Sequence, residues 1–319
     1  MAIAKAFGDN QFVARNTYPL LRPFLTEPLT TEQITVAIAD LPSHLAGTTL
    51  VQLSDFHFDG RSLPAKILSE AIAQCNAAVP DLVVLTGDFV TNQAHEIHAL
   101  IPYLQRLQSR CGVYAILGNH DNRYNRYYQT RTVIREALVA NGIPTLWNEI
   151  AYPFGAELPL VGLADFYSKE FRPAPVFAQL DDQTPRIVLS HNPDSLVALQ
   201  PFRADLVLSG HTHGGQVTIP GWGSVPGILQ AWSAAIPNWA RPFIPFLRKD
   251  CDRVLRHWEW AAGLHTLGQN QLYVNRGLGS YFPGRLFCPP EVTVIRLVRS
   301  LAEKSPQPTT SPDRINSFD

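Results

Sequence analysis

Short motifs rich in aspartate and histidine follow apolar runs of strand length at five places in the chain. Asp55-Phe56-His57 follows LVQLS, Gly87-Asp88 follows DLVVLT, and Gly118-Asn119-His120-Asp121 follows VYAIL. His191 follows RIVLS, and Gly210-His211-Thr212-His213 follows DLVLS. Ligands of α/β proteins commonly bind at the carboxyl ends of the strands, where the chain turns. We therefore expect these five strand ends to form one site.

The side chains in these motifs are typical ligands of divalent metal ions. They are carboxylates, imidazoles and one carboxamide, a set that suits Mn, Fe or Zn. Two cations about 3.5–4 Å apart can clamp a phosphoryl group and lower the pKa of a bridging water, which produces hydroxide. Because one ion does not need seven ligands, we predict two divalent cations, with Mn as first choice, and Asp88 as the carboxylate that bridges them. The seven predicted ligands are Asp55, His57, Asp88, Asn119, His191, His211 and His213.

The elements that must position these motifs alternate along the chain. Helical patterns over 64–77, 95–108 and 126–141 follow the first three strand-like runs. Shorter apolar pieces over 149–163 resemble a hairpin, and strand-like runs over 272–276 and 292–298 close the pattern. The alternation predicts an α/β fold with two packed sheets and helices outside them.

One continuous domain is predicted over residues 46–300. Residues 1–45 are expected to form an irregular N-terminal segment, and residues 301–319, rich in Pro, Ser and Thr, a disordered tail. Residues 218–260 interrupt the alternation with five of the six tryptophans and five prolines, so they are predicted to be an apolar insertion.

Composition limits the classes of partner. With 26 basic and 27 acidic residues and a formal net charge of -1, the chain has no electrostatic signature of nucleic-acid binding. No signal peptide and no apolar, proline-free run of 18 residues is evident. We therefore expect a cytoplasmic protein, with a possible peripheral contact to the inner face of the membrane through residues 225–258, where aromatic residues precede Arg248, Lys249, Arg253 and Arg256. A lipid-facing lid and a structural use of the insertion, either packing on the sheet edge or an oligomer contact, are equally open.

The ordered motifs D-x-H, G-D, G-N-H-[DE], H and G-H-x-H resemble those of the calcineurin-like metallophosphoesterase superfamily, over about residues 46–298. The resemblance implies a four-layer α/β/β/α sandwich of two mixed β-sheets flanked by helices. It implies that Asp55, His57, Asp88 and His213 hold one cation, and that Asp88, Asn119, His191 and His211 hold the other. It gives His120 the role of stabilising the transition state or protonating the leaving oxygen, and implies that Asp121 orients the ring of His120.

Four longer strings resemble a bacterial branch of membrane-associated phosphodiesterases that includes UDP-diacylglucosamine pyrophosphatases. They are ADLPSHLAGTTLVQLSDFHFDG, LSHNPD, SGHTHGGQV and LYVNRGLGSYFPGRLFCPPEVTVIRL. With the apolar insertion, this resemblance predicts hydrolysis of a phosphodiester or pyrophosphate bond in a lipid-linked or UDP-sugar-lipid substrate, by attack of metal-bridging hydroxide. Arg276 and Arg285 are candidate phosphate ligands, and a structural role for them is equally open.

Two alternatives use the same fold. A soluble phosphatase or cyclic-nucleotide phosphodiesterase would need the same metal ligands. A non-catalytic scaffold would be recognised by the loss of ligands, but all seven ligand positions and His120 are occupied by the expected residues.

Overall fold

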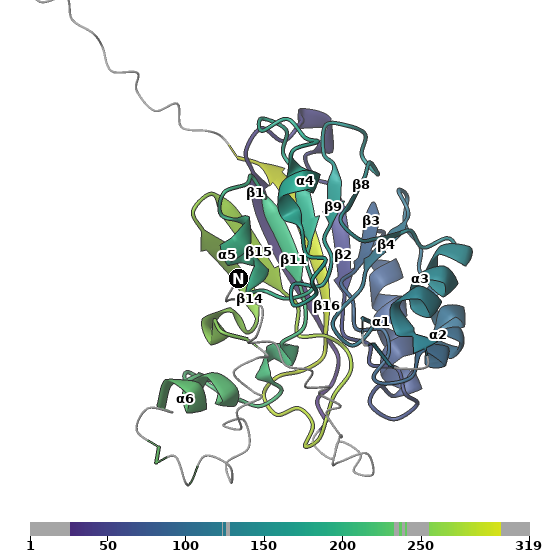
Figure 1. Cartoon of the computed structure of the whole chain (residues 1–319), viewed down its shortest axis with the longest axis vertical. Coiled ribbons are helices and arrows are strands. Elements are labelled where there is room, and N and C mark those ends of the chain that lie inside the picture. Colours follow the sequence, from purple (N-terminus) through teal and green to yellow (C-terminus); the bar gives the residue numbers. More distant parts are fainter. Residues whose placement is uncertain are drawn as a thin grey trace, which may run out of the picture.

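Two six-stranded sheets pack face to face, with helices on their outer sides (Figure 1). The computed structural model describes residues 26–122, 124–125, 128–232, 236–237, 240 and 255–300. In spatial order, the first sheet consists of β1 (Thr30–Ile38), β16 (Glu291–Arg299), β2 (Thr49–Leu53), β3 (Leu82–Leu85), β4 (Val113–Ile116) and β7 (Thr145–Leu146). The second consists of β14 (Gly263–Leu267), β15 (Asn270–Val274), β11 (Leu206–Ser209), β10 (Ile187–Leu189), β9 (Leu160–Gly162) and β8 (Glu149–Ala151).

The strands that precede the motifs run parallel within each sheet. In the first sheet β2, β3, β4 and β7 are parallel, and in the second β9, β10, β11 and β15 are parallel. The strands β8 and β14 are antiparallel to their neighbours, and β16 is antiparallel to β2. Parallel strands end at one edge of a sheet, so the residues that follow them gather there. The predicted hairpin over 149–163 is confirmed as β8 and β9.

Helices cover the outer faces of both sheets. The first sheet is covered by α1 (Ala65–Ala77), α2 (Ile97–Leu104) and α3 (Thr130–Ala140), which lie together in Figure 1. The second is covered by α4 (Pro173–Phe177) and α5 (Ser195–Leu199). The three predicted helices are confirmed, but α3 starts at residue 130 instead of 126. The reason is a short hairpin, β5 (Tyr124–Asn125) and β6 (Tyr128–Gln129), which ends directly before it.

Three apolar clusters fill the spaces between the layers. The middle cluster joins side chains of both sheets, such as Leu50 and Val84 with Leu189 and Leu208. One outer cluster joins the first sheet to α1, α2 and α3, and the other joins the second sheet to α4 and α5. The central strands are buried on both faces, which explains their unbroken apolar runs. The predicted four-layer α/β/β/α architecture is confirmed.

The N-terminal segment differs from its prediction. Thr30–Ile38 forms β1, which pairs in parallel with β16 along its whole length, so the expectation of irregular backbone is wrong there. Polar and apolar residues alternate in this edge strand, and only Val36 and Ile38 are fully buried, so its sequence lacks the continuous apolar run of the inner strands. Residues 1–25 and 301–319 lie outside the described part of the chain, and the limits of the domain stay a prediction.

The beginning and the end of the predicted insertion are described. It starts with a short hairpin, β12 (Thr218–Ile219) and β13 (Gly223–Ser224), and continues in α6 (Val225–Trp232). Most of residues 233–254 lie outside the described ranges. Among the described helices, none combines the length and the apolar character that crossing a membrane would require.

The middle layer should determine stability. We expect Leu206→Ala to lower the free energy of unfolding by about 2–5 kcal/mol, because the lost methyl groups leave a cavity between the sheets. Leu264→Ala on the edge strand β14 is the matched control, since Leu264 is 44% exposed and Leu206 fully buried. Its effect should stay within about 0.5 kcal/mol. Urea denaturation would measure both, and equal losses would contradict this account of the core.

Candidate metal centre

Two glycines in the motifs make room for the two central carboxylates. A Cβ atom on Gly118 would lie 2.1 Å from Oδ1 of Asp88, and a Cβ atom on Gly210 would lie 2.2 Å from Oδ2 of Asp55. Real Cβ atoms do not approach other atoms so closely. The glycines that open the G-N-H-D and G-H-T-H motifs are therefore required by the close approach of one strand end to the next.

The backbone at the strand ends is unusual. Positive φ angles occur at five of the seven predicted metal ligands, although a residue with a side chain rarely adopts them. They are Asp55 (51°), His57 (43°), Asp88 (56°), His211 (73°) and His213 (51°). Such conformations cost energy and concentrate at functional sites, where the surrounding structure enforces them. Here they turn the chain sharply after each strand, so that the side chains face one another.

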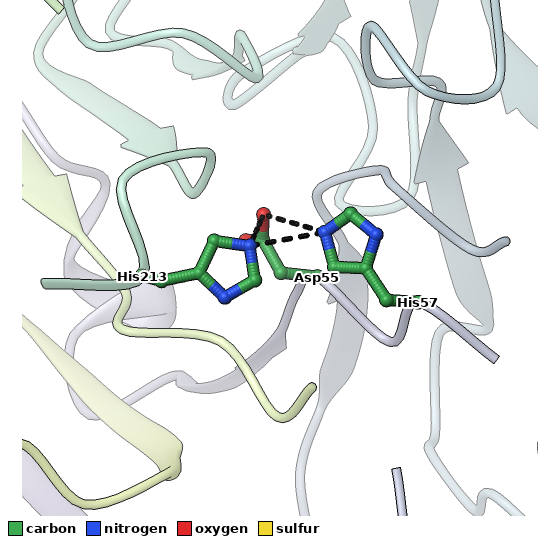
Figure 2. Close-up of side chains that lie close together, drawn as sticks. All are labelled: Asp55, His57 and His213. Atoms are coloured by element: carbon green, nitrogen blue, oxygen red, sulfur yellow. Dashed lines mark hydrogen bonds and ion pairs between the residues drawn. The ribbon is translucent and has the colours of Figure 1, made fainter. Parts of the chain in front are cut away.

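The first group of donors consists of Asp55, His57 and His213 (Figure 2). The Nε2 atoms of the two histidines are 3.0 Å apart. Oδ1 of Asp55 lies 3.8 Å from Nε2 of His57 and 3.4 Å from Nε2 of His213. Figure 2 shows the carboxylate and the two rings directed toward one another. Three donor atoms this close together could hold one metal ion.

The second group consists of Asp88, His191 and His211, and Asp88 connects it to the first. Oδ2 of Asp88 lies 3.2 Å from Nε2 of His191 and 3.4 Å from Nε2 of His57. Asn119 joins the second group through Oδ1, which is 2.8 Å from Nδ1 of His211. The structure thus brings all seven predicted ligands together, with the predicted bridging carboxylate between the two groups.

The histidines are held so that one ring nitrogen of each faces the other donors. Nδ1 of His191 is 2.7 Å from the carbonyl oxygen of Thr86, and Nδ1 of His213 is 3.2 Å from that of Gly279. A ring nitrogen that donates to a carbonyl carries the proton, which leaves a lone pair on Nε2. Nε2 of His191 is fully buried, and despite its proximity to Asp88 it has no partner in hydrogen-bonding geometry. A buried imidazole nitrogen that faces a carboxylate without a hydrogen bond fits a divalent cation.

The protein groups alone leave strong charges in this buried site. Burial opposes ionisation of Asp88, but His191, His120 and His57 together outweigh it and hold the pKa of Asp88 well below its usual range. Burial also opposes the charged form of His191, but Asp88 raises the pKa of His191 to about 10. Burial lowers the pKa of His213 to about 3, which keeps its ring neutral. Metal ligation requires neutral imidazole, so a cation bound here would take the place of the proton on His191.

His120 stands beside this cluster, but its ring is not held by Asp121. Nδ1 of His120 is 2.9 Å from the carbonyl oxygen of Thr91, so this carbonyl orients the ring. The carboxylate of Asp121 is buried and accepts backbone N–H bonds from Phe89, Val90 and Gly118. The predicted role of Asp121 is therefore wrong: its side chain joins two motif loops. Burial, and then Asp88, raises the pKa of Asp121 to about 8.

Comparison with known families agrees with this geometry. The model of the calcineurin-like phosphoesterase family matches residues 48–215, which is more than half of the chain and includes every predicted ligand. The chain belongs to this family. Members of the family use divalent metals, and this phosphoesterase presents the donor groups for them.

Two relatives with assigned activities are similar over most of the phosphoesterase. Phosphodiesterase YaeI of Escherichia coli is 32% identical over 276 residues, which cover 85% of this chain and 90% of YaeI. UDP-2,3-diacylglucosamine pyrophosphatase LpxG of Chlamydia muridarum is 30% identical over 299 residues, which cover 80% of this chain and 84% of LpxG. Both similarities support a hydrolase of phosphoric esters.

The two candidate phosphate-binding arginines of the phosphoesterase have structural partners. Arg276 forms ion pairs with Glu32 at 2.6 Å and with Glu291 at 2.7 Å. Arg285 is 1% exposed, and its guanidinium donates to the carbonyl oxygens of Arg276, Gly277 and Gly279. These contacts favour the structural alternative over phosphate binding. Arg285 thus holds in place the loop over residues 276–279, which contacts His213 through the carbonyl oxygen of Gly279.

Two residues near the metal centre were missed from the sequence. Tyr281, on the loop after β15, has its hydroxyl 2.5 Å from Nδ1 of His57. Asp165, three residues after β9, is buried, and burial raises its pKa despite the influence of His191. Both residues follow parallel strands of the second sheet and so obey the rule that identified the ligands. They were missed because neither residue belongs to a recognisable sequence motif.

Because Asp88 belongs to both donor groups, its replacement should affect both cations. We expect Asp88→Asn to lower the metal content of manganese-reconstituted protein from two equivalents to one or fewer, since a neutral amide cannot replace a shared carboxylate. Mass spectrometry with inductively coupled plasma would measure it. Asp182→Asn, on an exposed loop, is the control and should keep both equivalents. An unchanged metal content in Asp88→Asn would contradict the bridging role.

Proposed function

We propose that this phosphoesterase hydrolyses a phosphodiester or pyrophosphate bond of a lipid-linked or UDP-sugar-lipid substrate with two divalent cations, of which manganese is our first choice. The main support is the convergence of all seven donors around the shared carboxylate of Asp88, with His120 beside them. The activities assigned to YaeI and LpxG support the phosphodiester and pyrophosphate alternatives.

The site residues divide the work as follows. Asp55, His57, Asp88 and His213 would hold one cation, and Asp88, Asn119, His191 and His211 the other. When bound, the cations would attract the phosphoryl oxygens and lower the pKa of a coordinated water. His120 would donate a proton to the leaving oxygen from Nε2. The hydrogen bond from Nδ1 to Thr91 keeps that ring oriented and stabilises its imidazolium form.

The returning end of the insertion is bonded to neighbours of metal ligands, which supports a role at the substrate entrance. Thr212, between two ligand histidines, donates its hydroxyl to the carbonyl oxygen of Ala261 at 2.6 Å. The carboxylate of Asp194, three residues after His191, accepts the backbone N–H groups of Arg256 and His257. Because this returning end is held at the strand tips, we propose that the insertion borders the entrance.

Two neighbouring segments, one at the start of the insertion and one on the loop after β15, expose large apolar side chains. Thr218 donates to the carbonyl oxygens of Leu286 and Phe287, so the segments lie side by side. The exposed side chains are Ile219 (45%), Trp222 (70%), Phe282 (39%), Leu286 (36%) and Phe287 (61%), which we call the apolar loop surface. It suits contact with a lipid interface.

The membrane contact was predicted for residues 225–258, which lie largely outside the described ranges. Trp232, which is described, is 59% exposed. The apolar loop surface extends the proposed contact to residues 219–222 and 282–287. A position on the inner face of the membrane stays a prediction from the sequence, as does the absence of a nucleic-acid partner.

Hydrolysis of bis(p-nitrophenyl) phosphate tests the proposed chemistry. We expect activity that is lost on chelation and restored by manganese. His120→Ala should lower kcat by about 10²- to 10⁴-fold, because it removes a proton donor, while the metal content stays unchanged. His98→Ala, which changes an exposed histidine of α2, is the control and should keep full activity. Metal-loaded protein without activity on this ester or on any diphosphate would refute the proposal.

Substrate presentation separates the lipid proposal from its alternatives. We expect a higher kcat/KM for a lipid-linked diphosphate in vesicles than for cyclic nucleotides or p-nitrophenyl phosphate. The double variant Trp222→Ser/Phe287→Ser should raise KM for the vesicle substrate about tenfold and leave bis(p-nitrophenyl) phosphate unaffected, since it removes lipid contacts alone. Preference for the water-soluble substrates would instead support a soluble phosphatase or cyclic-nucleotide phosphodiesterase.

A further inference from the structure

A cavity of about 580 Å³ borders the strip of chain over residues 278–281. Ser280 lines the cavity, whereas the hydroxyl of the next residue, Tyr281, is 2.5 Å from Nδ1 of His57 on the side of the metal centre. The N–H of Ser280 donates to the carbonyl oxygen of Ser62 at 3.0 Å, which joins the strip to the loop after the first motif. A single strip of chain thus separates the cavity from the metal centre. The cavity has a volume that is typical of small-molecule sites, about 300–1,000 Å³.

The walls of the cavity are mainly apolar. Four segments that are distant in the sequence supply them, with the side chains of Pro28, Pro64, Ile67, Leu278 and Pro290. Three of these residues are prolines, which have no backbone N–H to offer a ligand. The hydroxyl of Ser62 donates to Asp59 at 2.8 Å, and that of Ser280 accepts from Nε of Arg285 at 2.9 Å. Because the walls offer few unused polar groups, they suit an alkyl chain.

The charged residues that line the cavity leave an excess of positive charge. Three cationic side chains, those of Arg61, Lys66 and Arg285, accompany one carboxylate, that of Glu27. Glu27 accepts the N–H of Phe287, and the guanidinium of Arg285 donates to backbone carbonyl oxygens. Arg61 and Lys66 are exposed, so they lie at the mouth of the cavity. An apolar interior with cationic groups at its mouth fits an amphiphile that has an alkyl chain and an anionic head.

The cavity adjoins the apolar loop surface. Phe287, which belongs to that surface and is 61% exposed, donates its N–H to Oε1 of Glu27 in the cavity wall at 2.8 Å. A lipid interface that contacts Phe287 would therefore reach the mouth of the cavity. A substrate lies differently, since its phosphoryl group must be at the metal centre, on the other side of the strip over 278–281. The position of the cavity favours a lipid of the membrane itself over the chain of the substrate.

We infer that this cavity binds one acyl chain of an anionic membrane lipid, whose headgroup lies between Arg61 and Lys66. Such a lipid would fix the phosphoesterase on the membrane beside its metal centre. The inference goes beyond the proposed function, because it concerns binding and involves no metal ligand. Binding and hydrolysis can therefore be tested separately.

Calorimetric titration of manganese-loaded protein with decyl phosphate tests the site, with saturating inorganic phosphate present to occupy the metal centre. We expect one equivalent to bind, about tenfold more tightly than octyl phosphate, because two more methylene groups are buried. Decyltrimethylammonium, which has a chain of the same length and a positive head, should bind about tenfold more weakly than decyl phosphate. Equal affinities for the two head charges would overturn the inference.

Two variants test the interior and the mouth of the cavity. Ile67→Trp fills the cavity, so it should weaken decyl phosphate binding about tenfold and abolish the gain from octyl to decyl phosphate. Ala73→Trp, at an exposed position of α1, is its matched control and should bind as the wild type does. Lys66→Glu should weaken binding about tenfold and keep the gain from the longer chain, since it changes the exposed mouth alone. Hydrolysis of bis(p-nitrophenyl) phosphate should be unchanged in all three. Unchanged decyl phosphate binding in Ile67→Trp or in Lys66→Glu would contradict the site.

Vesicles identify the source of the chain. The wild type should sediment with phosphatidylglycerol vesicles in the absence of substrate, and Ile67→Trp should need about tenfold more lipid. Equal sedimentation of the two proteins would refute docking on a membrane lipid, even where decyl phosphate binding differs. If the wild type binds the vesicles and Ile67→Trp does so more weakly, but neither hydrolyses a phosphoester, the proposed function fails and this inference stands.

Discussion

The buried carboxylate of Asp88 is the constraint on which the rest of the centre depends. Removing a charge from water is costly unless opposite charges and hydrogen bonds replace the solvent. Here the N–H of His120 binds one carboxylate oxygen, and the rings of His57 and His191 approach the other. These partners come from loops of both sheets. Their attraction to one carboxylate, or to cations bound there, holds the two sheets in a fixed relation at this edge.

The close approach of the strand ends restricts which residues can occupy them and strains their backbone. The strand ends come so near to one another that Gly118 and Gly210 have no room for a side chain, and five ligands adopt positive φ. Strain of this kind persists where packing on all sides enforces it. The enforcement comes from the middle layer, whose buried strands fix the direction in which every loop leaves the sheet. The rigid sandwich thereby stabilises a ligand geometry that the isolated loops would not keep.

Much of the fold and the ligand set could be predicted because both follow from the ends of apolar strands. A run such as DLVVLT requires burial on both faces, and a polar residue directly after it must lie at the sheet edge. The partner of a polar side chain is less predictable, because adjacent positions can face different ways. Asp121 follows His120 yet binds backbone N–H groups, and Thr91, whose side chain gives no signal, supplies a carbonyl to His120. The edge strand β1 escaped prediction because it buries one face only in part.

The insertion and the metal centre are mechanically linked. The helix α6 packs against the turn that contains His213 and against Trp258–Trp260, where the insertion returns. That returning segment is bonded to Thr212 and Asp194, neighbours of three ligand histidines. A displacement of the insertion by a lipid surface or a bulky substrate would therefore act on the loops that hold His191, His211 and His213. Since bound cations would restrain the same histidines, any effect of metal occupancy on the position of the insertion is matched by an equal effect of that position on metal binding.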